Sequence, residues 1–139
     1  MNVRYLSVIS LGKILGKSKK PRDILERIPA DIDKRDRSLL TEIVYGVIRY
    51  RDYLDWIIRH FLKNPSNLSQ HTINNLRTSI YQIKYMRIPE WAVVNEAVNT
   101  EKLLKGKPGL VNAVLRNFLR HKDNIVPSED NKLEYISIT

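Results

Sequence analysis

The feature that most restricts the fold of this chain is the spacing of apolar residues near its middle. They recur at i, i+1, i+4, i+5, i+8 and i+9, and these positions line one face of an α-helix. The residues concerned are Leu39, Leu40, Ile43, Val44, Val47 and Ile48. The pattern continues to Leu62, with an expected break near residues 50–52. No segment shows a convincing two-residue alternation, so the sequence predicts a wholly helical protein.

Polar residues, glycine and proline indicate where the other helices begin and end. Asp33 and Ser69 are good N-caps, Pro21 and Pro89 suit the first turn of a helix, and Gly16 suits a helix end. The expected helices cover residues 3–15, 21–28, 34–62 with the break, 70–83, 91–104 and 109–120. The predicted fold is therefore an all-α bundle of about seven helices, which could divide into two three-helix subdomains.

The length of 139 residues corresponds to one domain, and a chain of this size can fold on its own core. We expect residues 1–122 to form that domain and residues 123–139 to be a connector or tail. No apolar run approaches the length of a membrane span, and no signal peptide is evident. The chain has no cysteine, which excludes disulfides and thiolate sites and fits a cytoplasmic protein.

Charge gives the first indication of a partner. The formal net charge is +9, and three stretches contain no acidic residue. Residues 1–22 hold six Lys and Arg, residues 56–89 hold five, and residues 102–121 hold five, whereas residues 122–139 hold four acids against two Lys. Such blocks indicate a surface for a polyanion if the fold brings them together. The alternative is a basic protein with scattered surface lysines.

The segment "GLVNAVLRNFLR", residues 109–120, predicts an amphipathic helix. Its apolar residues fall in one half of the helical circle, while Asn112, Arg116 and Arg120 share the other half. This polar stripe is a candidate second surface for the polyanion. A solvated helix face would show the same pattern.

No enzyme motif is apparent in the sequence. "GKILGKS", residues 12–18, imitates the end of a phosphate-binding loop, but its first glycine is one residue too close and a helix precedes it. His60, His71 and His121 are too dispersed for a metal site. Asp33 and Asp36 are explained by helix capping. We therefore expect no catalytic residue, no metal site and no cofactor in this chain.

Aromatic residues have two possible roles. We expect Trp56 and Trp91 to be core or half-buried anchors. Tyrosines and arginines alternate in "YGVIRYRDY", residues 45–53, and such a pattern can stack on unpaired bases. Tyrosine rings packed at a helix junction, with their hydroxyls in water, are the more common arrangement.

Three ordered segments resemble the NusB-like domain. They are "DRSLLTEIVYGVIRYRDYLDWII" (36–58), "YQIKYMRIPEWAVVNEAVNTEKLL" (81–104) and "GLVNAVLRNFLR" (109–120). This all-helical domain occurs in the transcription antitermination factor NusB and at the N-terminus of ribosomal RNA cytosine-5 methyltransferases called RsmB, Sun or Fmu. "YGVIR" and "VNAVLRNFLR" resemble the methyltransferase branch, since the antitermination branch typically has an acid where Arg116 stands.

The resemblance implies RNA binding and substrate positioning in rRNA processing, without catalysis in these residues. The family's catalysis needs a cysteine nucleophile and an S-adenosylmethionine fold, which would lie in a longer parent protein beyond residue 139. The resemblance places RNA contacts near the basic first helix, and the matching residues are Arg4, Lys13, Lys17, Lys19, Lys20 and Arg22. With a catalytic domain implied, the stripe of Asn112, Arg116 and Arg120 is a candidate second RNA surface or a face that docks that domain. The alternatives are an antitermination factor that binds RNA with a small ribosomal protein, and a protein-interaction module.

Overall fold

The computed structural model describes residues 2–125, which form six α-helices. The helices are α1 (Val3–Gly16), α2 (Pro21–Glu26), α3 (Lys34–Arg59), α4 (Gln70–Tyr85), α5 (Glu90–Leu103) and α6 (Pro108–His121). Two short 3-10 helices lie at Pro65–Asn67 and Lys122–Asn124. Residues 2–125 contain no strand. The all-α prediction is therefore confirmed, and most of the expected tail lies outside the described residues.

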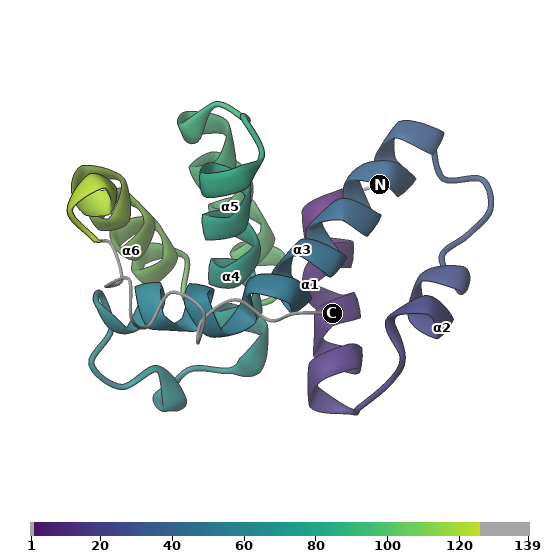
Figure 1. Cartoon of the computed structure of the whole chain (residues 1–139), viewed down its shortest axis with the longest axis horizontal. Helices are drawn as coiled ribbons and strands as arrows, with labels where there is room; N and C mark the ends of the chain where they lie inside the picture. Colours follow the sequence, from purple (N-terminus) through teal and green to yellow (C-terminus); the bar gives the residue numbers. More distant parts are fainter. Residues whose placement is uncertain (1, 126–139) are drawn as a thin grey trace.

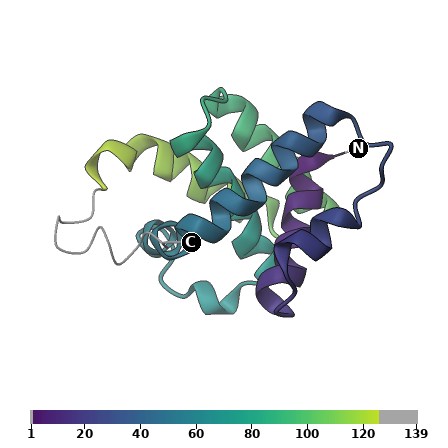
Figure 2. The same ribbon diagram turned by 45° about the vertical axis from the view of Figure 1, so that its right-hand side comes forward.

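The helix count differs from the expected seven because α3 passes through the expected break. Tyr50 has non-helical dihedral angles (φ −106°, ψ 18°), so the helix is kinked there instead of ending. Figure 2 shows the change of direction, with the first part of α3 crossing the molecule and its last turns seen nearly end-on. The predicted caps are present: the Asp33 carboxylate accepts from Arg35 N at 2.8 Å, and Ser69 Oγ accepts from Thr72 N at 3.1 Å.

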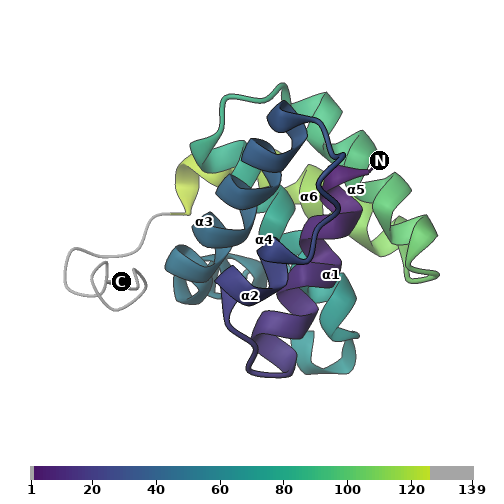
Figure 3. The ribbon, with the colours of Figure 1, turned by 90° about the vertical axis from the view of Figure 1, so that its right-hand side faces the viewer.

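Helix α4 is the centre of the molecule and packs against α1, α3, α5 and α6. In Figure 1 it lies between α1 and α2 on one side and α6 on the other. Figure 3 shows α1, α2 and α3 together on the side away from α6. Because α4 contacts helices from both halves, the six helices share one core instead of forming two independent subdomains.

The core is apolar around α4, but α4 itself is rich in polar residues. Every residue from Thr72 to Gln82 is buried. The polar side chains are hydrogen-bonded, as burial requires: Asn75 Nδ2 donates to Ala97 O at 2.9 Å, and Gln82 Nε2 donates to Thr78 O at 2.9 Å. The surrounding fully buried apolar side chains include Leu11, Leu40, Ile43, Leu54, Ile57, Leu76, Ile80, Leu115 and Phe118.

A close approach between α3 and α4 requires a glycine. A Cβ added at Gly46 would lie 2.0 Å from Cζ of the buried Tyr81 ring. Real atoms cannot come so near, and an aromatic ring in the core has little room to move. Gly46 therefore sets the distance between the two helices.

We predict that Gly46→Ala destabilises the protein by about 1–3 kcal/mol, because overpacking outweighs the roughly 1 kcal/mol that alanine contributes to a helix. Urea unfolding followed by circular dichroism measures this change. Gly16→Ala is the matched control, since nothing lies within 4 Å of a Cβ at the end of α1, and it should leave stability equal or slightly higher. Equal free energies of unfolding for the two variants would contradict the packing argument.

Candidate nucleic-acid interface

The end of α1 carries a cluster of exposed lysines, which are Lys13, Lys17, Lys19 and Lys20. The chain reverses tightly here, because Lys17 N and Lys19 N both donate to Lys13 O, at 3.1 and 3.3 Å, and Ser18 has a positive φ of 53°. Within residues 2–125 none of the four side chains forms an ion pair. They are point charges directed to solvent, as a phosphate-binding surface requires.

The two arginines predicted for the same surface have protein partners. Arg4 lies in the first turn of α1, about 20 Å from Lys17 at the helical rise of about 1.5 Å per residue. It is half-buried, and its Nε donates to Gln82 Oε1 at 3.1 Å. Arg22 is exposed and pairs with Glu26 at 3.0 Å. The predicted set therefore divides into four unpaired lysines and two engaged arginines.

Part of the third basic block, residues 102–121, lies near the lysine cluster. A Cβ at Gly12 would lie 3.2 Å from His71 Cε1, so the start of α4 contacts α1 next to Lys13. His71 also lines a hollow of about 330 Å³ together with Lys105 and Lys107 in the turn between α5 and α6. The structure thus brings cations from the first and third blocks to the two sides of the α4 N-terminus.

The second basic block, residues 56–89, contributes less charge to the surface than its composition suggests. Arg77 is only 9% exposed and holds Asp55 with two parallel bonds, Nε to Oδ1 at 2.7 Å and Nη2 to Oδ2 at 2.9 Å. Its Nη1 donates to Asn74 Oδ1 at 2.8 Å. Asp55 lies one residue before the acid-free stretch of residues 56–89. The composition of that stretch therefore did not indicate that Arg77 has an acidic partner. Arg77 joins α3 to α4 and has no free donor face for RNA.

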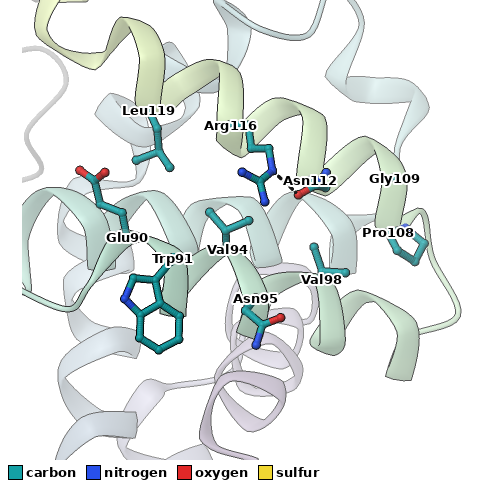
Figure 4. A pocket seen from close by; sticks show the side chains of 10 residues that line it. All are labelled: Glu90, Trp91, Val94, Asn95, Val98, Pro108, Gly109, Asn112, Arg116 and Leu119. Atoms are coloured by element: carbon teal, nitrogen blue, oxygen red, sulfur yellow. Dashed lines mark hydrogen bonds between the residues drawn. The ribbon is translucent and has the colours of Figure 1, made fainter.

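Asn112 and Arg116 lie on α6 above a groove between α5 and α6. Arg116 Nε donates to Asn112 Oδ1 at 2.9 Å, so the predicted stripe is a bonded pair and not two independent side chains. The groove has a volume of about 720 Å³. In Figure 4, Val94 and Val98 point from α5 toward α6, with Val94 below Arg116 and Val98 below Asn112. Arg120 is exposed further along α6.

The prediction for the two tryptophans is half correct. Trp56 is half-buried and stacks on Tyr53, with ring centroids 6.0 Å apart. The expectation of a buried anchor is wrong for Trp91, whose exposed fraction is 74%. Trp91 lies on the same stripe of α5 as Val94 and Val98, but its indole stands at the rim of the groove, where α6 does not cover it.

Most tyrosines of α3 and α4 form a cluster, whereas Tyr45 is 45% exposed. Tyr50 at the kink stacks on Tyr85 with ring centroids 4.5 Å apart, and Tyr81 and Tyr85 are 5.2 Å apart. Arg49 lies over the Tyr50 ring at 5.4 Å, and Lys84 lies over the Tyr53 ring. The faces of these rings are thus largely occupied by other side chains of the protein. This favours the packing role over base stacking.

Burial of this cluster predicts loss of stability in alkali. Desolvation, followed by the neighbouring tyrosines, raises the pKa of Tyr85 well above its ordinary value of 10.0, and burial also raises the pKa of Tyr81. Above pH 10 the unfolded chain releases protons that the folded protein retains, so stability should fall as pH rises beyond 10. Urea midpoints at pH 9 and 11 should show this decline, and Tyr85→Phe should reduce it. An equal decline in the variant would contradict the assignment to Tyr85.

Other features of residues 2–125 concern metals, histidines and membranes. The three histidines are exposed, and His60 and His121 bond backbone carbonyls at the ends of α3 and α6, as expected for helix-end histidines. The described residues contain no group of three or more metal-ligating side chains. None of their helices is long and apolar enough to cross a membrane.

The helical architecture agrees with a family match. Residues 1–120 match the model of the NusB family. The chain therefore belongs to the NusB family, which confirms the resemblance seen in its three sequence segments.

Several similar proteins are named as methyltransferases. The chain is 32% identical over 133 residues to the ribosomal RNA small subunit methyltransferase B of Serratia proteamaculans (strain 568), covering 94% of this chain and 31% of the relative. The protein of the same name from Pectobacterium carotovorum (strain PC1) gives the same identity and coverage. That of Escherichia coli O1:K1 is 30% identical over 128 residues, covering 90% of this chain and 30% of the relative. The chain thus spans about a third of the length of these relatives.

Proposed function

We propose that this chain is an RNA-binding, substrate-positioning module of a ribosomal RNA cytosine-5 methyltransferase. The observation that carries the proposal is the cluster of four lysines at the end of α1, which form no ion pair within residues 2–125 and are flanked by Lys105 and Lys107 across the α4 N-terminus. A cluster of ammonium groups attracts phosphates, fixes the position of an RNA and reads little of its sequence. The family and the names of the relatives support RNA as the polyanion.

The proposed division of labour places chemistry elsewhere. This chain has no cysteine to serve as a nucleophile. S-adenosylmethionine, the nucleophile and methyl transfer would belong to a linked catalytic domain in the cytoplasm, while the present residues hold the RNA. Asn112, Arg116 and Arg120 form a second contact surface on α6, either for RNA or for that domain. Arg4 and Arg22 reach RNA only if they leave Gln82 and Glu26.

Replacement of Lys17, Lys19 and Lys20 by alanine should weaken binding to all RNA sequences. The slope of log affinity against log salt should become shallower by roughly 0.7–0.9 for each phosphate that the variant no longer neutralises. Fluorescence anisotropy with a small-subunit ribosomal RNA hairpin and a scrambled hairpin, from about 50 to 200 mM salt, measures both quantities.

The matched control removes three exposed cations elsewhere: Lys34, Arg35 and Lys63. It has the same net charge as the first variant, so a larger loss of affinity in the first variant assigns binding to the α1 cluster. Equal losses would mean that only total charge matters. A wild-type chain that ignores both RNAs at low salt would contradict RNA binding and favour a protein-interaction module.

A further inference from the structure

Trp91 stands out as a large aromatic side chain left in water. Its exposed fraction is 74%, and it stands at the rim of the α5–α6 groove. Exposed tryptophans are uncommon, because a buried indole contributes much more to stability, and at binding surfaces they act as anchors. Removing Trp91 from water would require a ligand that covers the groove from outside.

The groove combines one apolar floor with polar groups on both walls. Val94, Val98 and Leu119 supply the apolar surface. Its volume of about 720 Å³ suits one or two nucleotides, since small-ligand sites fall between roughly 300 and 1,000 Å³. Asn95 and Asn112 present amides from opposite helices, and the amide of Asn112 holds the guanidinium of Arg116 in place.

Charge favours an anionic strand as the occupant. Glu90 is the single acid among the residues that line the groove, and it pairs with Lys122. Arg116 donates one hydrogen bond within residues 2–125, through Nε, which leaves both terminal guanidinium nitrogens for a ligand. Arg116 is the single cation among the residues that line the groove. An acidic wall, which would select a basic peptide, is absent from the described residues around this groove.

We propose that the α5–α6 groove binds an unpaired nucleotide of the RNA, with its base stacked on the Trp91 indole and its phosphate on Arg116. Stacking on an aromatic ring is available to any unpaired base, and a planar guanidinium suits a phosphate. A base in a duplex already stacks on its neighbours, so the site selects single-stranded RNA. This inference rests on the proposed function and assigns it a second contact, separate from the α1 lysines.

Fluorescence of Trp91 tests the stacking directly. In a Trp56→Phe variant, Trp91 is the only tryptophan, and circular dichroism verifies that the variant is folded. An oligouridine strand of about ten nucleotides should quench its emission. The same sugar–phosphate strand without bases should bind through charge and leave the emission unchanged. Equal quenching by both strands, or none by either while binding occurs, would overturn the proposal.

Affinity measurements give a second, independent test in the wild-type background. Trp91→Ala should weaken binding of the oligouridine roughly five- to a hundredfold, with a smaller loss for Trp91→Phe, which keeps a ring. Binding of an RNA duplex and of the strand without bases should not change. Leu103→Ala is the matched control because Leu103 is also exposed on α5, at 57%, and does not line the groove.

The possible outcomes separate this inference from the proposed function. Oligouridine affinity that is equal in Trp91→Ala and Leu103→Ala, with a salt slope that still depends on the α1 lysines, would refute the base site and retain RNA binding. No affinity of the wild-type chain for any of the three probes would refute both. That last result would make the groove a surface for a protein.

Discussion

The arrangement of the C-terminal half depends on one buried carboxylate, that of Glu101 at the end of α5. Its exposed fraction is 0%, and three donors surround it. Thr72 Oγ1 donates to Oε2 at 2.6 Å, Asn75 Nδ2 donates to Oε1 at 3.0 Å, and Lys107 N donates to Oε2 at 2.9 Å. A buried charge is tolerated only when it is satisfied in this way, so α4, α5 and the following turn are fixed relative to one another.

The turn after α5 is shaped around this carboxylate. Gly106 is required there because a Cβ would lie 2.0 Å from Glu101 Oε2. With the turn fixed, α6 begins at Pro108 and must return along α5, which creates the groove beneath Arg116. The same turn holds Lys105 and Lys107 beside the α4 N-terminus. One hydrogen-bonded carboxylate therefore positions the α5–α6 groove and the turn that carries Lys105 and Lys107.

The apolar pattern predicted the fold class and most helix ends, because helical periodicity and capping are local properties of the chain. The spacing around Ile43 and Val47 and the caps Asp33 and Ser69 are examples. The burial of α4 was not predictable in this way. Asn75, Thr78 and Ser79 look like a solvated face, and only contacts with distant residues such as Glu101 explain their burial. The expectation that Trp91 is a core or half-buried anchor rested on its residue type, which cannot show where the covering helix ends.

Basic composition overestimated the number of cations available to a partner for a related reason. Several arginines use their several donors within the protein: Arg37 donates to Ile28 O at 3.1 Å and Pro29 O at 2.8 Å, and Arg77 holds Asp55. A guanidinium suits such multiple bonds, whereas an ammonium group is strongly hydrated and stays at the surface. The α1 cluster consists of lysines alone, and none of them forms an ion pair within residues 2–125. The division between structural arginines and surface lysines therefore defines the proposed polyanion surface more narrowly than the net charge does.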